Sequence, residues 1–210
     1  MEGWPLYDSY SDSPTFNSKR SKRYGVKVVR TLDEFMQMVS VRSAVFMSEQ
    51  VCPFLEEFDG NDFCALHLVG YKGKEPIGCI RIRFFAGFAK IERLAVRHEF
   101  RNTRIGFKLV YAAIALAKQK GYSKIYGHIQ ERLLKFWSHF GGRPRREPFA
   151  FSDFTYLEML LETEPAPDAI TLETDPYVLI RPEGAWHRKG VLEESIERPV
   201  TSPLHRLDAA

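Results

Sequence analysis

The chain has few cysteines, no long apolar run and almost no excess of charge of either sign. Its three cysteines, Cys52, Cys64 and Cys79, are odd in number and lack metal-site spacing, a usage typical of reduced thiols in the cytosol. No apolar run approaches the roughly 18 residues of a membrane-spanning helix, and the N-terminus shows no apolar segment of signal-peptide type. We therefore expect a soluble, cytoplasmic protein that has no membrane partner and no bound metal.

The charge balance gives no argument for a nucleic-acid partner, and we expect none. Lysine and arginine number 30 against 27 aspartates and glutamates, which leaves a net charge of +3. The sequence has no Gly-x-Ser-x-Gly nucleophile elbow and no Walker glycine-lysine pattern, and its six histidines show no metal-binding pattern. At 210 residues, the chain fits one domain of about 150 residues with appendages.

Composition divides the chain into a central domain and two appendages. Residues 1–24 are rich in Ser, Asp, Tyr and Pro without any period, and we expect a disordered tail there. Residues 25–161 carry the periodic segments of a folded domain. Residues 162–210 are interrupted by repeated prolines and contain no catalytic motif. Three arrangements of this extension stay open: it lies across its own core, it lies across a partner subunit in a homodimer, or it is partly disordered.

The segment Ile91–Gly121 reads as a strand, a tight turn and an amphipathic helix. One helix face collects the apolar residues Ile105, Leu109, Ala112, Ala113, Leu116 and Ala117. The turn at 101–107 leaves backbone N–H groups unpaired at the helix start, where the helix dipole adds partial positive charge. Arg101 and Arg104 add full charges at the same place. This pattern predicts a binding site for a pyrophosphate.

Periodicity in the rest of the domain predicts an alternation of strands and helices. Thr31 and Glu34 form a capping box that starts the first helix. The other expected elements are strands at 25–30, 64–71, 77–85 and 89–96, the helix that ends at Gly121, a strand at 124–130, a short helix at 131–140 and one or two strands within 149–161.

Two motifs give the chain a family resemblance. The loop Arg101-x-x-Arg104-x-Gly106 resembles the acyl-CoA signature of the GNAT superfamily of N-acyltransferases, Gln/Arg-x-x-Gly-x-Gly/Ala. Arg104 stands where the family has a glycine, and its side chain can itself bind phosphate. The second motif resembles the ElaA-like branch of that superfamily, and these residues fall in register with it: Val41, Arg42, Val45, Phe46, Glu49, Gln50, Cys52, Pro53, Asp59, Gly60 and Asp62.

The resemblance implies an α/β (α+β) GNAT fold over residues 25–161, with a mixed central sheet, flanking helices and two neighbouring parallel strands that splay apart. In that fold the pantetheine arm of the acyl carrier lies in the gap and pairs with backbone like an added strand. The implied co-substrate is acetyl-CoA or another acyl-CoA, and no metal is implied. The implied cofactor-binding residues are Leu94, Ala95, Val96, Arg101, Asn102, Thr103, Arg104, Ile105, Gly106, Phe107 and Trp137.

A base for the acceptor amine is also implied, because the superfamily often uses a carboxylate on the strand that carries Glu92. In a regular strand, Glu92 faces the same side as Leu94 and Val96. The alternative for Glu92 is an ion pair with a neighbouring cation, and the candidates are Arg81, Arg83 and Lys90.

The acidic segment and Trp137 carry two further expectations. Glu49, Glu57 and Asp59 lie where the family admits its acceptor and would attract a cationic amine. The alternative is that Asp59 and Asp62 form an Asx-type turn around Gly60. Trp137 matches the family tyrosine that protonates the leaving thiolate. Because an indole N–H has no useful acidity, we expect Trp137 to shield the thioester from water.

The sequence therefore favours an acyl-CoA-dependent N-acyltransferase that moves acetyl from acetyl-CoA to a primary amine, on a small molecule or a peptide, by direct attack. One alternative transfers longer acyl chains from acyl-CoA or an acyl carrier protein through a tunnel lined by Phe84, Phe85, Phe88, Phe149 and Phe151. The other is a non-catalytic, CoA-binding regulatory module, which Trp137 at the tyrosine position supports.

Overall fold

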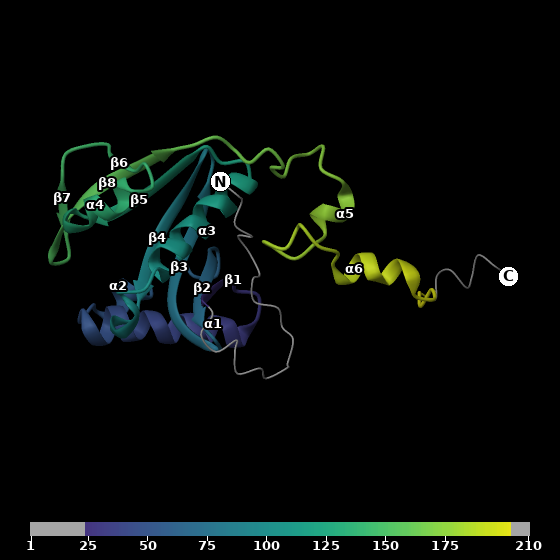
Figure 1. Ribbon diagram of the computed structural model, residues 1–210, viewed down its shortest axis with the longest axis horizontal. Coiled ribbons are helices and arrows are strands. Elements are labelled where there is room, and N and C mark those ends of the chain that lie inside the picture. Colours follow the sequence, from purple (N-terminus) through teal and green to yellow (C-terminus); the bar gives the residue numbers. More distant parts are fainter. Residues whose placement is uncertain (1–23, 203–210) are drawn as a thin grey trace. The chain divides into compact units, whose positions relative to one another are not determined.

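A computed structural model gives the protein's structure and describes residues 24–202 (Figure 1). The tail predicted for residues 1–24 lies outside the described residues except at Tyr24. The chain forms two compact units, Met1–Thr171 and Leu172–Ala210.

The first unit is built on one mixed sheet, which within the described residues has 8 strands. Their order is β1-β2-β3-β4-β5-β8-β6, and β7 pairs with β8. The strands are β1 (Tyr24–Val28), β2 (Leu66–Lys72), β3 (Glu75–Phe85), β4 (Phe88–Val96), β5 (Lys124–Gln130), β6 (Arg143–Pro144), β7 (Phe149–Phe151) and β8 (Phe154–Glu162). Among the described strand pairs, only β4 and β5 run parallel. The mixed sheet that the resemblance implied is confirmed.

Helices connect the strands, and α1, α3 and α4 lie where the sequence predicted helices. They are α1 (Leu32–Arg42), the π-helical η2 (Ser43–Glu49), α2 (Phe54–Glu57), the 3₁₀ turn η3 (His98–Phe100), α3 (Ile105–Gln119), the 3₁₀ turn η4 (Glu131–Leu133) and α4 (Leu134–Ser138). The capping box of α1 is formed, since the Glu34 N–H donates to Thr31 Oγ1 at 3.2 Å and the Thr31 N–H donates to Glu34 Oε2 at 3.2 Å. These bonds satisfy N–H groups that no turn of the helix can reach.

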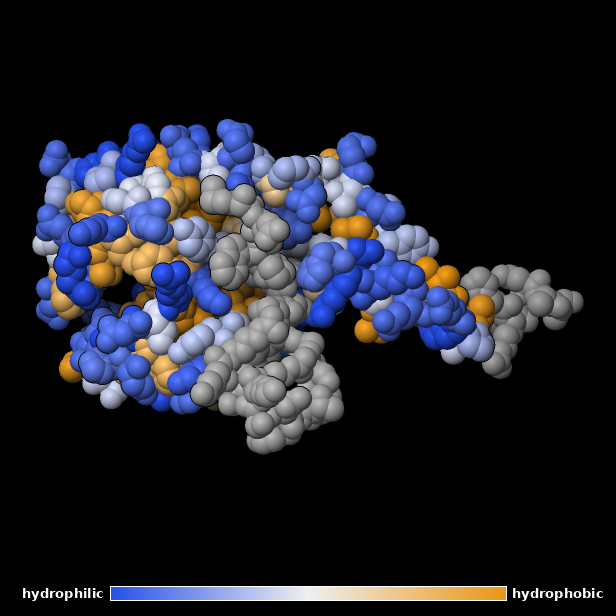
Figure 2. Space-filling model, in the orientation of Figure 1, coloured by the Kyte–Doolittle hydropathy of each residue, from blue (hydrophilic) through white to orange (hydrophobic). Residues whose placement is uncertain are grey.

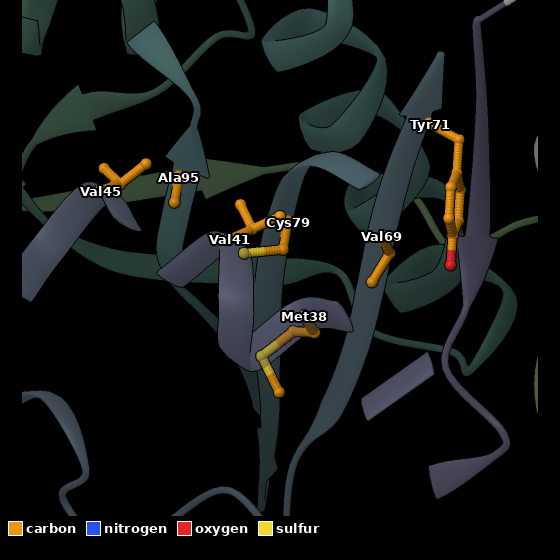
Figure 3. Close-up of a cluster of buried hydrophobic side chains, with 7 residues drawn as sticks. All are labelled: Met38, Val41, Val45, Val69, Tyr71, Cys79 and Ala95. Carbon is orange, nitrogen blue, oxygen red and sulfur yellow. The ribbon is translucent and has the colours of Figure 1, made fainter. Parts of the chain in front are cut away.

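Helix α1 covers one face of the sheet with an apolar cluster. Met38 and Val41 of α1 and Val45 of η2 pack there against strand residues (Figure 3), which are Val69, Tyr71, Cys79 and Ala95. We call this side of the sheet the α1 face. Other strand residues belong to the α1 face when their side chains point the same way as those of Val69 and Cys79.

Helix α3 covers the opposite face, the α3 face. Gly70 and Gly78 alternate with the residues under α1 and make room for this helix. A Cβ on Gly70 would lie 2.8 Å from Ile105 Cγ1, and a Cβ on Gly78 would lie 2.9 Å from Leu109 Cδ1. The apolar stripe predicted for α3 is confirmed, because the following residues are all buried: Ile105, Leu109, Ala112, Ala113, Leu116 and Ala117.

The start of the predicted C-terminal extension belongs to the first unit. The Ala166 N–H donates to the Lys118 carbonyl at 3.0 Å, and the Ile170 N–H donates to the Gln119 carbonyl at 2.7 Å. Residues 163–171 thus pack on the end of α3. The homodimer expected through the extension stays a prediction.

The second unit holds short helices, α5 (Pro176–Leu179), α6 (Val191–Glu194) and the 3₁₀ turn η5 (Ser195–Glu197). Asp175 caps α5 by accepting from the Tyr177 N–H at 2.8 Å. Arg181 donates to both carboxylate oxygens of Glu193, at 2.9 and 2.7 Å, and joins the segment after α5 to α6. Across residues 24–202, no helix is both long enough and apolar enough to cross a membrane.

Candidate active site

Strands β4 and β5 separate part-way along their length. Their pairing is limited to Ala89 with Ile125 and Lys90 with Tyr126, and beyond these pairs the strands part (Figure 1). Gly127 lies at the point of separation, where a Cβ would stand 3.0 Å from the Ile91 carbonyl oxygen. The splayed parallel pair that the resemblance implied is therefore confirmed, and we call the gap the fork.

Strand β4 also carries a bulge beside the fork. Cys79 pairs with Ala95 and Arg81 pairs with Glu92, so β4 has one more residue than β3 between these two pairs. Arg93 takes up the extra length with a φ of 54°, which is rare for a residue other than glycine. A bulge leaves the extra residue outside the ladder and turns backbone groups away from the neighbouring strand.

The bulge corrects the expected orientation of Glu92. Val96 pairs with Gly78 on the α3 face, whereas Glu92 pairs with Arg81 on the α1 face, so Glu92 and Val96 do not share a side. Arg81 donates to Glu92 Oε1 from Nε at 3.1 Å and lies 3.0 Å away through Nη2. Lys90 Nζ stands 3.0 Å from Glu92 Oε2, and Arg83 stands 3.7 Å from Oε1. The ion-pair arrangement, which the sequence left open, is the one formed.

The start of α3 presents unpaired backbone donors beside the end of β4. The Lys108 N–H donates to the Arg104 carbonyl at 3.1 Å, whereas the N–H groups of Gly106 and Phe107 meet no acceptor among the described residues. A Cβ on Gly106 would touch only Val96 Cγ2, at 3.7 Å, which is an ordinary contact. The fold itself therefore does not need a glycine here, and the space over these N–H groups is open to a ligand.

Two arginines flank these N–H groups, and they differ in the contacts that their side chains make. Arg101 forms a bidentate ion pair with Glu49, at 2.5 Å from Nη1 and 2.6 Å from Nη2. The side chain of Arg104 is exposed and has no partner among residues 24–202. Thr103 Oγ1 donates to the Phe100 carbonyl at 2.6 Å and closes the turn before α3. The predicted loop residues Arg101, Asn102, Thr103, Arg104, Ile105, Gly106 and Phe107 thus form one continuous rim, and Glu49 joins them rather than the acidic loop.

Trp137 lies buried in an aromatic cluster that joins α4 to the first turn of α3. The ring centroids of Phe107 and Phe136 are 5.0 Å apart, and those of Phe107 and Phe140 are 5.6 Å apart. Trp137 contacts Phe136 edge-on at 5.4 Å. Because α4 is fixed against α3, it borders the fork on the α3 face. The shielding role of Trp137 stays a prediction.

A network of buried charged side chains lies on the α1 face, between α1 and the sheet. Sequence reasoning did not predict it. Arg42 and Arg81 are both fully buried. Asp62 Oδ1 accepts from Arg42 Nη1 at 2.5 Å and from Arg81 Nη1 at 2.8 Å. Glu57 accepts from Arg42 Nε, and its carbonyl accepts from Arg42 Nη2 at 2.8 Å. The available signal was helical spacing, since Arg42 shares the buried face of α1 with Met38.

Asp59 is held in the same network. Its carboxylate accepts from Arg81 at 2.8 and 2.6 Å, and it also accepts from the Asn61 N–H at 3.1 Å, which forms the Asx-type turn. The bonds from Arg81 hold the pKa of Asp59 well below its usual range. Arg93 adds a further cation, 3.2 Å from Glu57 and 3.3 Å from Asp59. The negative charges proposed to attract an amine are therefore already neutralised by arginines.

The β7–β8 hairpin encloses the fork on the α1 face. At its tip Ser152, with a φ of 49°, donates from Oγ to Glu56 Oε2 in α2 at 2.6 Å. This bond joins two elements that are far apart in sequence. Figure 2 shows a hollow at the left of the molecule, between the part that carries β7 and β8 and the part that carries α1 and α2.

The five phenylalanines of the proposed acyl tunnel do not line one cavity. Phe84 faces the α3 face and stacks on Tyr122 at 5.2 Å, while Phe85 and Phe88 stack on each other at 4.9 Å on the α1 face. In the described part of the chain, no group of three or more His, Cys, Asp and Glu side chains is placed to hold a metal ion.

Comparison with known proteins fits this geometry. The profile of the acetyltransferase (GNAT) family matches residues 34–141, about half of the chain. The chain belongs to the GNAT family. It is accordingly an acyltransferase, and its fork, bulge and open helix start lie within or beside the matched residues.

Individual GNAT proteins resemble about two thirds of the chain. A Bacillus subtilis (strain 168) protein named as an acetyltransferase is 27% identical over 144 residues, which span 67% of this chain and 98% of the relative. Escherichia coli ElaA has the same fold, with a TM-score of 0.61 and 22% identity over 67% of this chain and 100% of its own. A GNAT acetyltransferase from Elizabethkingia anophelis, solved with acetyl-CoA bound, has a TM-score of 0.51 and 16% identity over 66% of this chain and 97% of its own.

Proposed function

We propose that the protein transfers acetyl from acetyl-CoA to a primary amine on a small molecule or a peptide. The observation that carries this proposal is that two features occur together. One is the start of α3, where Gly106 leaves space for a ligand over unpaired N–H groups, and the other is the fork between β4 and β5. The bound acetyl-CoA of the Elizabethkingia relative supports the same co-substrate for this chain.

The residues present fit acetyl-CoA along its length. The N–H groups of Gly106 and Phe107 would bind the pyrophosphate, together with the free guanidinium of Arg104. Arg101 would join them when its pair with Glu49 opens. Leu94, Ala95 and Val96 border the fork on β4, where backbone groups that do not pair with β5 would pair with the pantetheine arm. The Val96 carbonyl accepts from Arg101 Nε at 3.2 Å.

The transfer would proceed by direct attack. The amine nitrogen forms a bond to the thioester carbon, the carbon–sulfur bond breaks, and the CoA thiolate leaves. Because a thiol has a pKa of about 8.5, this leaving group needs little help from an acid. Catalysis then depends mainly on holding the two reactants in line and on backbone N–H groups that polarise the thioester carbonyl. The absence of a tyrosine at Trp137 is compatible with turnover on these grounds.

The proposal is tested by incubating the full chain with acetyl-CoA and a panel of primary amines, comprising diamines, free amino acids and peptides with lysine or free N-termini. We expect release of free thiol and, by mass spectrometry, an acceptor heavier by one acetyl group. A parallel series with a long-chain acyl-CoA tests the acyl preference. Binding of CoA without any transfer, across the whole panel, would favour the regulatory module instead.

The binding site is tested separately with Gly106→Val. The added methyl groups would fill the space over the open N–H groups, so we expect CoA affinity to fall at least tenfold by calorimetry, or about 1.4 kcal/mol. Ala115→Val adds two methyl groups at a half-buried position further along α3 and should leave affinity unchanged. Unchanged affinity in a folded Gly106→Val protein would remove this site from consideration.

A further inference from the structure

We propose that His128 accepts the proton of the acceptor amine, held in one tautomer by Tyr126 and Glu158. This inference rests on the proposed amine transfer. It assigns a residue to the deprotonation of the amine, which the fork alone does not explain. An alkylammonium has a pKa of about 10.4, so it must lose a proton before its nitrogen can attack.

The sheet places His128 at the fork. Tyr126 belongs to the last β4–β5 pair, opposite Lys90, and His128 is the next residue of β5 on the same face. Lys90 pairs with Arg83 on the α1 face, so His128 also faces that side. The β7–β8 hairpin brings Phe149 against His128, with ring centroids 5.2 Å apart. His128 therefore lies where the strands have parted, on the side that the hairpin and α2 enclose.

Hydrogen bonds fix which ring nitrogen is free. The Tyr126 hydroxyl lies 2.8 Å from Glu158 Oε1 and 2.7 Å from His128 Nε2. A phenol has one hydrogen and an ionised carboxylate can only accept, so Tyr126 donates to Glu158. Its oxygen must then accept from an Nε2–H of His128, which leaves Nδ1 with a free lone pair. The β5–β8 register, which pairs His128 with Glu158, sets up this chain of bonds.

The free nitrogen is open to a ligand. His128 Nδ1 has no hydrogen-bond partner among the described residues, and it is not one of their buried atoms that lack a partner. His67 differs, because its Nδ1 is buried without a partner and its Nε2 lies 3.0 Å from the Asp62 carbonyl. Of these two strand histidines, only His128 offers an accessible acceptor nitrogen.

The surroundings favour a neutral imidazole that can take up a proton. Burial lowers the pKa of His128 and the charge of Lys90 lowers it further, whereas Glu158 and Glu92 act in the opposite direction. Burial and Glu158 raise the pKa of Tyr126 to about 12, despite the charges of Arg145 and Arg146, so its hydroxyl keeps its proton. Once His128 is charged, Glu158 stabilises the imidazolium through Tyr126.

Glu92 is less suited to this role. Its two oxygens are engaged by Arg81 and Lys90 at 3.0–3.1 Å, so a proton would have to displace a paired cation. Glu158 Oε2 is also buried and accepts no hydrogen bond from the described residues, with Arg146 Nε 3.4 Å away. Glu158, however, serves as the acceptor for the Tyr126 hydroxyl.

The proposed step moves two protons from the ammonium and one acetyl group from sulfur to nitrogen. The ammonium gives one proton to His128 Nδ1, and the neutral nitrogen adds to the acyl carbon. The carbon–sulfur bond then breaks, the thiolate leaves and takes the second N–H proton, and the amide and CoA thiol result. His128 returns its proton to water and regains the neutral tautomer.

The test is the pH profile of kcat/KM for the full chain with acetyl-CoA and the best amine of the panel. We expect His128→Gln to lower kcat/KM at pH 7 by about 10²-fold or more. The acid limb of the wild-type profile should disappear, leaving a rise that continues toward the pKa of the amine itself. Acetyl-CoA affinity by calorimetry should stay unchanged. Exposed His187 provides the matched control, and His187→Gln should retain the wild-type profile.

Two further variants distinguish the base from its positioning partner. Tyr126→Phe should move the acid limb, and the His128 pKa measured by NMR, while leaving the KM for acetyl-CoA unchanged. His128→Ala should recover part of its activity with added imidazole, which shows that loss of folding is not the cause.

Each outcome decides between the two proposals. If the wild type transfers acetyl and His128→Gln keeps its rate and acid limb, or if Glu92→Gln alone removes the limb, the role of His128 is overturned and the transferase stands. If the wild type binds CoA but acetylates no amine of the panel, the proposed function fails and the role of His128 fails with it.

Discussion

Replacing Asp62 with asparagine isolates the contribution of one negative charge to the buried network. The substitution keeps the size of the side chain and an acceptor oxygen at Oδ1, but it removes the charge between Arg42 and Arg81. Both guanidinium groups are fully buried, and Asp62 is 9% exposed. Neither arginine can turn to solvent when the carboxylate is lost.

The expected loss of stability follows from the two bonds. Arg42 and Arg81 donate to Asp62 Oδ1 at 2.5 and 2.8 Å. A hydrogen bond between charged groups contributes about 1.5–3 kcal/mol and a neutral one about 0.5–1.5 kcal/mol, so two weakened bonds cost about 2–3 kcal/mol. Removing one partner of a buried ion pair typically costs about 3–5 kcal/mol, and Glu57 and Asp59 remain to compensate part of that. We expect about 3 kcal/mol, or a Tm lower by roughly 6–12 °C.

The assay is urea and thermal unfolding of the full chain, with Asp153→Asn as the matched control. Asp153 is exposed in the β7–β8 turn and makes no hydrogen bond or ion pair with the described residues. Its replacement should change stability by less than about 0.5 kcal/mol. Equal stability of Asp62→Asn and Asp153→Asn would refute the argument that the network holds the α1 face together.

The pH dependence gives an independent check on the same variant. Burial raises the pKa of Asp62, but the bonds from Arg42 and Arg81 outweigh it and hold the pKa below its ordinary value of 3.8. A depressed pKa in the folded state contributes stability that is complete above the ordinary value and is lost as pH falls through the folded one. The difference between wild type and Asp62→Asn should stay constant from about pH 7 to pH 5 and shrink below about pH 4. A difference that persists undiminished at pH 2 would point to packing.

Two more substitutions examine the CoA side of the fork. Trp137→Phe should retain most turnover, whereas Trp137→Ala should lose more of it and about 3–5 kcal/mol of stability; a folded Trp137→Phe protein with no activity would show that the indole itself is needed. Glu49→Gln should free Arg101 and raise CoA affinity about two- to fivefold by calorimetry, because a surface ion pair contributes roughly 0.2–1 kcal/mol. Glu99→Gln, which breaks the similar pair with Arg97 outside the loop, should have no such effect, and equal responses of the two variants would contradict a role for Arg101.

The sequence by itself determined the elements whose signals are local. The six apolar positions of α3 follow the helix period, and the Thr31–Glu34 capping box spans one turn, so both could be read without the fold. The loop before α3 was identified for the same reason, since its arginines and Gly106 lie within a few residues of one another. The sequence also indicated one or two strands within 149–161, and the structure forms two of them, β7 and β8.

Tertiary structure alone decided the features that depend on how distant strands align. The bulge at Arg93 becomes visible only against β3, and it changes the face that Glu92 occupies. Arg42 and Arg81 are expected at the surface as isolated residues, and they are buried because the acidic loop supplies their counter-charges. The contact of His128 with Tyr126 and Glu158 depends on the β5–β8 register, and no local period encodes which residue of one strand faces which residue of another.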